Sequence, residues 1–366
     1  MGELIESFDS ERIPIDSSLR ISGQYPYYGA TGIIDYIDSY IFDGEYVLLA
    51  EDGANIIMRN YPVAYLTQGK FWLNNHAHIM RMVKGDNQFL VQILEKMNYS
   101  KYNTGTAQPK LNSNIVKRIN LRVPIPEEQQ KIGTIFKQLD DTITLHQRKL
   151  DQLKELKKAY LQLMFPKKDE TVPRVRFADF EDDWQLCKLG DVVEIFDGTH
   201  QTPRYTDSGV KFVSVENIAT LETKKYITHE AYEKEYSKKR AKKGDILMTR
   251  IGDIGTMKVI ETDEPLAYYV TLALLKAKET NPYFLSFIIS SPEIQRNIWK
   301  RTLHIAFPKK INLGEINQVE MKITIFEEQD KIGDLFTNLD DAIILNQNKL
   351  NQLKSLKKSY LQNMFI

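Results

Sequence analysis

The sequence predicts an α+β fold in which a globular part followed by a long helix occurs twice. The first observation is a repeat, because residues 125–165 and 325–365 are identical at roughly two positions in three. Both segments also have the spacing of a long amphipathic helix. The parts that precede them contain short β-prone runs separated by turns, and these parts differ strongly from each other. We therefore expect one duplicated domain rather than an array of short repeats.

The composition is that of a folded chain. Of its 366 residues 42% are hydrophobic, and 49 basic side chains balance 49 acidic ones to a net charge of +0. This predicts about two domains with sizeable cores, and it means that any affinity for nucleic acid must come from local clusters. The single cysteine, Cys187, excludes an internal disulfide and indicates a reducing compartment. No secretory signal or membrane-length apolar run is present, so we expect a cytoplasmic location and no membrane partner.

Each repeated segment is expected to form one helix about 60 Å long. Its apolar residues advance by alternating steps of four and three, which is typical of a coiled-coil seam. The seam residues are Ile132, Phe136, Leu139, Ile143, Leu150 and Leu153 in the first copy, and Ile332, Phe336, Leu339, Ile343, Leu350 and Leu353 in the second. Since the registers match, we expect the two helices to pack as an antiparallel coiled coil around a pseudo-two-fold axis. His146 and Asn346 share one seam position, where a polar residue favours a register-fixing role over a catalytic one.

These patterns divide the chain into four parts. The predicted limits are residues 1–123 for the first globular domain, 124–166 for the first long helix, 167–323 for a linker with the second globular domain, and 324–366 for the second long helix. Strands are expected at residues 46–50, 63–67, 210–215 and 245–249, and helices at 89–97 and 282–299. Turns are expected at Gly44, Gly53, Gly69 and Gly244. The first domain has no counterpart of residues 175–189, so either it has lost one opening strand or this sequence omits that strand.

Sequence signatures of catalysis are missing. The chain has no glycine-rich phosphate loop and no serine nucleophile elbow, and six histidines with one cysteine offer little material for a zinc centre. His76 and His78 are therefore interpreted as a polar pair at a surface or groove. Asn281-Pro282 superficially resembles part of a methyltransferase tetrapeptide, but the start of a helix explains it better. Residues 250–255 are either a glycine-bracketed loop that approaches nucleic acid or a tight turn between strands.

Several segments resemble the DNA-specificity subunits of Type I restriction-modification systems. Residues 124–132 (PIPEEQQKI) are similar to the proline-rich start of that family's conserved helix, and residues 106–112 (TAQPKLN) resemble a recurrent segment just before it. In the second half, residues 198–203 (GTHQTP) and 244–252 (GDILMTRIG) are similar to motifs of one class of its target-recognition domains. Duplication with variable domains in between is the family's hallmark, so the resemblance covers the whole chain.

The resemblance implies a non-catalytic specificity subunit. Its two α/β target-recognition domains, separated by the two long helices, would each read one half of a bipartite, gapped site in double-stranded DNA. It implies two methyltransferase (M) subunits that carry S-adenosylmethionine, and restriction/translocase (R) subunits that use ATP and Mg²⁺. The chain itself would hold no cofactor and no metal, and would direct adenine methylation and restriction by these partners.

Polar and basic side chains near these segments are the expected DNA contacts. Asn, Gln, Thr and Arg side chains read base edges, whereas Lys mainly positions a protein on phosphates. The candidates are Tyr27, Asn75, Thr106, Gln108 and Lys110 in the first half, and Thr199, His200, Thr202, Arg204, Lys239, Arg240, Arg250, Lys309 and Lys310 in the second. Two other hypotheses remain open from the residues: a coiled-coil scaffold that assembles proteins without reading DNA, and an enzyme that acts on DNA alone.

Overall fold

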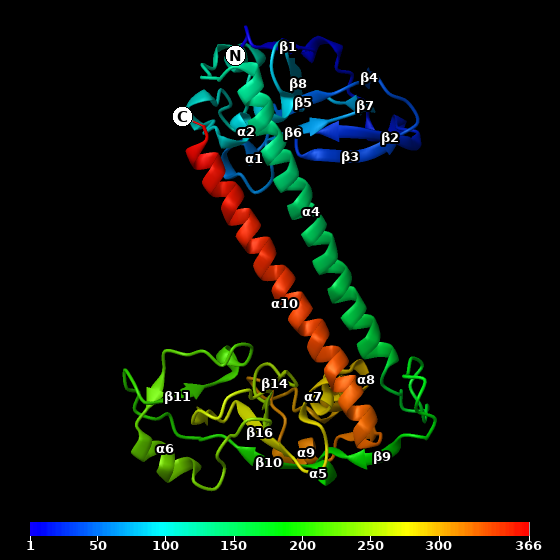
Figure 1. Ribbon diagram of the computed structural model, residues 1–366, viewed down its shortest axis with the longest axis vertical. Coiled ribbons are helices and arrows are strands. Elements are labelled where there is room, and N and C mark those ends of the chain that lie inside the picture. The colour runs from blue at the N-terminus through cyan, green and yellow to red at the C-terminus, as the bar shows by residue number, and fades with distance from the viewer. Residues whose placement is uncertain (366) are drawn as a thin grey trace. The chain divides into compact units, whose positions relative to one another are not determined.

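In the computed structural model, which describes residues 1–365, the chain forms two compact units (Figure 1). Unit 1 contains residues 1–148 together with those from 347 onward, and unit 2 contains residues 149–346. Each unit includes part of both long helices, α4 (Pro126–Leu163) and α10 (Phe326–Asn363). The prediction of one long helix per repeat is therefore confirmed. No helix of residues 1–365 is both long and apolar enough to cross a membrane.

Unit 1 contains two four-stranded sheets. The first is antiparallel in the order β1-β8-β5-β6, and the second has the order β3-β2-β7-β4. Helix α2 (Asn87–Lys96) packs against the first sheet and joins its strands in the main core of the unit. The strands are β1 (Ile5–Ser7), β2 (Ser22–Gly29), β3 (Gly32–Ile37), β4 (Phe42–Asp43), β5 (Tyr46–Ala50), β6 (Ala64–Thr67), β7 (Lys70–Leu73) and β8 (Ala77–Met82), with short helices α1 (Asn55–Met58) and α3 (Ser113–Arg118).

Unit 2 repeats the first sheet and adds different elements around it. Its four-stranded sheet has the order β10-β16-β13-β14, so each strand has a counterpart in the sheet β1-β8-β5-β6. A three-stranded sheet, β12-β11-β15, and a pair, β17-β9, complete the unit. The strands are β9 (Gln185–Lys188), β10 (Val193–Asp197), β11 (Val210–Val213), β12 (Tyr226–Ile227), β13 (Ile246–Thr249), β14 (Met257–Val259), β15 (Leu266–Tyr268), β16 (Leu272–Ala277) and β17 (Glu320–Ile323). The helices are α5 (Leu189–Val192), α6 (His229–Tyr236), α7 (Pro282–Ser290), α8 (Pro292–Arg301) and α9 (Leu313–Asn317).

Most local predictions are confirmed. Strands β5, β6, β11 and β13 lie where β-prone runs predicted them, and the four predicted turn glycines all have positive φ. The expected helix at 282–299 is instead two helices, because Pro292 lacks an N–H and starts α8. Asn281 caps α7 by accepting a hydrogen bond from Phe284 N, which confirms the helix-start interpretation. Residues 120–123 of unit 1, the counterpart of β17, are not in a strand.

The start of each long helix is held in the same way. The Gln129 side chain is buried, donates to Pro124 O at 2.7 Å and accepts from Asp86 N at 3.4 Å. Gln329 repeats this with Thr324 O at 2.7 Å and Asn281 N at 3.0 Å. A buried glutamine in the repeated sequence therefore ties each helix to the capped helix α2 or α7 of its own unit.

Within each unit the two long helices contact each other. In unit 1, Asp140 pairs with Lys357 at 2.5 Å and the Phe136 and Phe365 rings are 5.7 Å apart. In unit 2 the equivalent pair is Lys157 with Asp340 at 2.5 Å, while Phe165 and Phe336 stack at 5.7 Å. The contacts run in opposite sequence order along the two helices, so α4 and α10 are antiparallel within each unit. The repeated sequence makes the same ion pair twice.

Candidate nucleic-acid interface

The buried strand β5 ends in a turn that holds a loop of unit 1. Residues Val47–Ala50 are fully buried, and the chain leaves the sheet at Glu51. Leu111 N donates to Glu51 O at 2.7 Å, and Gly53 N donates to Pro109 O at 3.0 Å. Thr104 N donates to Lys110 O at 2.9 Å, which closes residues 104–110 into a loop that we call loop A.

Strand β13 carries the same frame in unit 2. Ile311 N donates to Arg250 O at 2.9 Å, and Gly252 N donates to Lys309 O at 2.9 Å. Leu303 N donates to Lys310 O at 2.8 Å and closes residues 303–310, which we call loop B. Gly53 and Gly252 both have positive φ, 105° and 85°, where a side chain would be strained. The two units therefore hold loops A and B with the same backbone hydrogen bonds, although the loop sequences differ.

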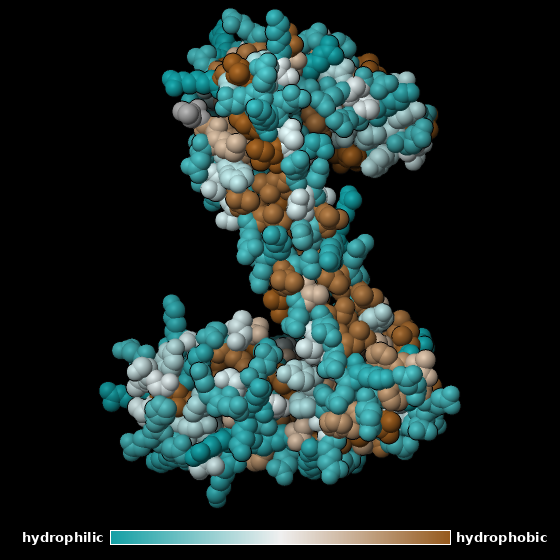
Figure 2. Space-filling model, viewed as in Figure 1, coloured by the Kyte–Doolittle hydropathy of each residue, from teal (hydrophilic) through white to brown (hydrophobic). Residues whose placement is uncertain are grey.

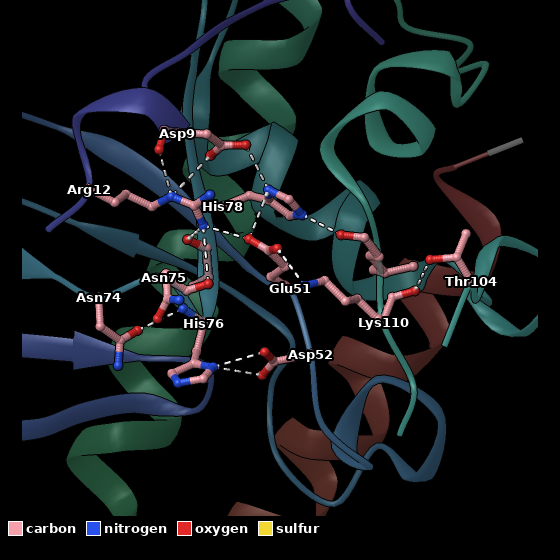
Figure 3. Close-up of polar contacts among 12 residues, drawn as sticks. Asp9, Arg12, Glu51, Asp52, Asn74, Asn75, His76, His78, Thr104 and Lys110 are labelled. Carbon is pink, nitrogen blue, oxygen red and sulfur yellow. Dashed lines mark hydrogen bonds and ion pairs between the residues drawn. The ribbon is translucent and has the colours of Figure 1, made fainter. Parts of the chain in front are cut away.

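A network of charged side chains supports loop A (Figure 3). Arg12 donates through Nη1 to Glu51 Oε2 at 2.6 Å and to Ala77 O at 2.7 Å, and Lys110 Nζ lies 3.4 Å from Glu51 Oε1. His78 Nδ1 lies 2.7 Å from Asp9 Oδ2, and its Nε2 lies 2.7 Å from Leu111 O. The loop is thus attached to the sheet through a side chain as well as through the backbone.

Asp9 is strongly stabilised as a carboxylate in this network. Burial alone would raise its pKa, but the hydrogen bond and charge of His78, the Ile79 N–H and the charge of Arg12 outweigh burial and lower the pKa to about 2. The two His78 ring nitrogens lie 2.7 Å from Asp9 Oδ2 and 2.7 Å from Leu111 O. Asp9 is therefore expected to remain charged over the whole physiological range.

The corresponding network of unit 2 has a reversed charge at its centre. Arg250 stands where Glu51 stands, and its Nη1 donates to Asp197 Oδ1 at 2.7 Å and to Val270 O at 3.1 Å. Asp197 Oδ2 lies 2.7 Å from His200 Nε2. Asp9 and Asp197 both follow a phenylalanine at the same place in the duplicated sequence. The same carboxylate therefore anchors different side chains in the two units.

In unit 1 the predicted contact residues fall into two groups. Asn75, Thr106, Gln108 and Lys110 are exposed, and Asn75 and Lys110 lie at the network of Figure 3. Tyr27 is different, because its side chain has no exposed surface and its hydroxyl accepts a hydrogen bond from Ile15 N at 2.9 Å. Thus a contact of Tyr27 with DNA requires residues around Ile15 to move, whereas the other four are presented to solvent.

In unit 2 the predicted residues divide in a similar way. His200, Thr202, Arg204, Lys309 and Lys310 are exposed, but Thr199 and Arg250 are buried. The Arg250 guanidinium donates hydrogen bonds to Asp197 and to the carbonyls of Val270 and Ile311. It therefore positions the turn that holds loop B, and its hydrogen-bonding capacity is largely used inside the unit.

Lys239 and Arg240 each form an ion pair with a glutamate of the neighbouring helix. They follow α6, where Lys239 pairs with Glu235 at 3.0 Å and Arg240 pairs with Glu233. The structure thus brings Arg250, His200, Lys309 and Lys310 together through shared contacts. Lys239 is linked to Thr199 through Tyr268, whose hydroxyl donates to Lys239 O at 2.9 Å and whose carbonyl accepts from Thr199 N at 3.2 Å.

The interpretation of His76 and His78 as one surface pair is half wrong. His76 is exposed and its Nδ1 lies 2.8 Å from Asp52 Oδ2, as a surface residue would. His78 is 1% exposed because β8 lies inside the sheet between β1 and β5. Asp9 and Leu111 O supply the hydrogen bonds that a buried ring requires. In residues 1–365 no group of three His, Cys, Asp or Glu side chains is placed to hold a metal ion.

Sequence reasoning missed the acidic members of both networks, Asp9, Glu51 and Asp197. One signal was present, since the first strands of the two halves share the pattern that ends in Phe8-Asp9 and Phe196-Asp197. The repeated aspartate marks a position that both domains use. Its partners come from distant segments, and only the tertiary structure identifies them.

The chain contains two copies of one α+β unit, and the two copies hold loops of different sequence on the same backbone frame. This defines a class of protein with a duplicated scaffold and two different loops. The chain belongs to the family described as the Type I restriction modification DNA specificity domain, whose model matches residues 1–155 and 181–355. It is thus a specificity protein of the Type I restriction-modification class, and DNA target recognition is the role of that family.

Individual relatives agree with this assignment. The chain is 30% identical to a candidate type I restriction enzyme specificity subunit of Haemophilus influenzae, over 71% of this chain and 67% of that one. It is 22% identical to a type I restriction enzyme specificity subunit of Methanocaldococcus jannaschii, over 85% of this chain and 76% of that one. A crystal structure of the S subunit of a Type I restriction-modification system from M. genitalium has the same fold, with a TM-score of 0.71 and 14% identity over 99% of this chain and 96% of that one.

Proposed function

We propose that this chain reads a bipartite, gapped target in double-stranded DNA, with one half of the target read by each unit. The observation that supports this most directly is the duplicated frame around loops A and B. Glu51 and Lys110 in unit 1 correspond to Arg250 and Lys310 in unit 2, on the same hydrogen-bonded backbone. Since the frame is common and the side chains differ, the two units are expected to recognise different half-sites.

The proposed DNA contacts are the exposed residues around these loops. Asn75, Thr106 and Gln108 in unit 1, and His200, Thr202 and Arg204 in unit 2, offer groups that can read base edges. Lys110, Lys309 and Lys310 are placed to pair with phosphates. Tyr27, Thr199 and Arg250 are expected to act by holding these segments in place, because each of them is buried.

The long helices are proposed to set the gap between the half-sites. Each has 38 residues and is therefore about 57 Å long at 1.5 Å per residue. One turn of duplex is about 34–36 Å, so a rigid helix pair of this length could separate two readers by more than one turn. An antiparallel coiled coil along the whole length would supply that rigidity.

Partner subunits are proposed to dock on the helices and to perform the chemistry. Hydrophobic residues gather along the long helices, while the visible face of each globular part is mostly hydrophilic (Figure 2). Exposed apolar side chains on the helices include Leu145 in unit 1, and Ile344 and Leu345 in unit 2. Such surfaces suit protein partners. We propose two methyltransferase subunits that use S-adenosylmethionine on adenine, and restriction subunits that use ATP, with no catalysis by this chain.

Selection from a random duplex library tests the proposal. The chain, co-purified with its methyltransferase subunits, is used at about 0.15 M salt, where non-specific binding is reduced. We expect enrichment of a two-part motif with a fixed gap. Replacing residues 1–123 with the same domain of another specificity subunit should then change only one part. An intact complex that enriches no sequence would instead support the scaffold hypothesis.

A further inference from the structure

Loop B presents two apolar side chains entirely to solvent. Ile305 is 98% exposed and Phe307 is 104% exposed, whereas Leu19, the next most exposed large hydrophobic residue among positions 1–365, is 73% exposed. Two fully exposed apolar side chains in one short loop indicate a binding surface rather than part of a core.

The loop that carries them is fixed at its base. Besides the closure by Leu303 N and Lys310 O, Lys310 also forms a β-bridge with Ile251, the residue after Arg250. Arg250 in turn is locked by Asp197. The two apolar side chains are therefore held out by an anchored loop, which lowers the entropy that binding has to remove.

Charge around the loop indicates the kind of partner. Loop B contains no acidic residue, and His304, Lys309 and Lys310 are exposed beside its apolar tip. The Lys309 ammonium also lies 4.6 Å from the centre of the Trp299 ring, so a cation and an aromatic ring lie side by side next to the loop. Duplex DNA combines an anionic backbone with apolar base faces, and this arrangement is complementary to it.

Comparison of the two loops shows that the apolar tip is particular to unit 2. Residues 107–110 read Ala-Gln-Pro-Lys, and residues 306–309 read Ala-Phe-Pro-Lys. Gln108 and Phe307 therefore match in sequence, although loop B is one residue longer than loop A, because the frame places Lys310, and not Lys309, at the position of Lys110. A glutamine can hydrogen-bond to a base edge, whereas a phenylalanine offers only its ring.

We propose that Ile305 and Phe307 insert at a base step in the half-site of unit 2, while Lys309 and Lys310 pair with the flanking phosphates. This rests on the proposed function of the chain as a reader of duplex DNA. Apolar side chains that enter a base step unstack it, and steps that unstack easily are favoured. Unit 2 then recognises the deformability of its half-site through loop B, in contrast to the polar loop A of unit 1.

The test uses the full chain with its methyltransferase subunits and the duplex that the wild-type complex selects. The double variant Ile305→Ser/Phe307→Ser is compared with Leu186→Ser, which changes a 66% exposed leucine of β9 in the same unit. We expect the double variant to bind the selected duplex with about tenfold lower affinity. In a selection it should lose definition only in the unit 2 half of the motif. The control should show neither change. Phe307→Trp should retain binding.

A fluorescent base gives a second readout. 2-Aminopurine placed at successive positions of the half-site should brighten at one step when the wild-type complex binds, because it is unstacked there, and should stay dim with the double variant. Equal affinity and equal brightening for both proteins would overturn the proposal. So would a double variant that no longer assembles with the methyltransferase subunits, because loop B would then be a protein-docking site. If the wild-type complex selects no motif at all, the proposed function fails first, and this inference fails with it.

Discussion

Buried charges in both units are paired, and their partners come from distant parts of the chain. Asp9 meets His78, Arg250 meets Asp197, and Arg176 meets Glu328. A buried charge that loses its partner is costly, because the remaining charge has been removed from water without compensation. Residue-scale predictions therefore concern single members of such pairs.

The Asp9 carboxylate is expected to make stability depend on pH. Its pKa is about 2 in the folded chain, below the ordinary value of 3.8, so the stabilisation is present above pH 3.8 and is lost as the pH falls toward 2. Asp9→Asn should therefore lower the free energy of unfolding by roughly 1–2 kcal/mol at pH 6. Below pH 4 the difference between the variant and the wild type should shrink as the pH falls. Urea unfolding of both proteins from pH 6 to pH 2 measures this. Glu11→Gln, at an exposed carboxylate in the same segment, is the control, and a difference that is constant with pH would contradict the prediction.

The Arg176–Glu328 pair should contribute strongly to unit 2. The guanidinium Nε and Nη2 each donate to a carboxylate oxygen at 2.8 Å, and the side chains are 12% and 0% exposed. Arg176→Met leaves a buried carboxylate without its cation and should lower the free energy of unfolding by about 3 kcal/mol. Arg174→Met, which removes a half-exposed arginine paired with Glu170, should have a much smaller effect. Thermal unfolding compares the two, and equal shifts would show that burial of the pair is not decisive.

At the scale of elements, the molecule uses one frame for two loops. The sheets β1-β8-β5-β6 and β10-β16-β13-β14 place the turns after β5 and β13 identically, and the same three backbone hydrogen bonds hold loops A and B. The two sheets thus fix the positions of loops A and B, and the loop sequences make the two units different. A change that distorts a loop without touching the sheet should alter recognition more than stability.

Gly105 is the position in loop A where such a change is sharpest. A Cβ there would lie 1.7 Å from Gln108 O, so Gly105→Ala cannot keep the conformation of the loop. We expect the selected motif to lose definition in the unit 1 half and to keep the unit 2 half, with little change in unfolding temperature. Gly314→Ala in α9 meets no atom within 4 Å and serves as the control. If both variants select the wild-type motif, loop A does not read DNA.

Over the whole molecule, the net charge of +0 leaves no general attraction to DNA. Binding should then depend on salt only through the few cations at the interface. Lys309→Gln and Lys310→Gln should each weaken binding to all sequences alike and reduce the slope of log affinity against log salt by about 1. Asn75 precedes strand β8, and Lys84 follows the opposite end of that strand. Lys84→Gln should therefore leave the slope unchanged. The complex is titrated with the selected duplex and with an unrelated duplex at several salt concentrations, which measures the affinity and its salt slope for each variant. If Lys309→Gln and Lys310→Gln leave the slopes unaltered, loop B does not contact DNA.

The sequence by itself determined those features of the structure that depend on local patterns of residues. The duplication, the two long helices, the strands β5 and β13, and the turns at Gly53 and Gly244 follow from periodicity and from residues with restricted backbone preferences. The family resemblance followed from contiguous motifs. Lys309 and Lys310 were predicted as DNA contacts from a local cluster of basic residues; both are exposed, and their contact with DNA stays a prediction.

Only the tertiary structure decided which residues meet and which face water. Asp9 and His78 lie far apart in sequence, and nothing local predicts their contact. Tyr27 and Arg250 look like polar contact residues but are buried. Tyr27 lies in β2 between β3 and β7, and the Arg250 guanidinium donates to Asp197 and to the carbonyls of Val270 and Ile311. Ile305 and Phe307 look like core residues but are almost fully exposed, because they lie in loop B, which backbone hydrogen bonds close at its base. Burial is set by packing between distant segments, and the pattern of a single segment does not contain that information.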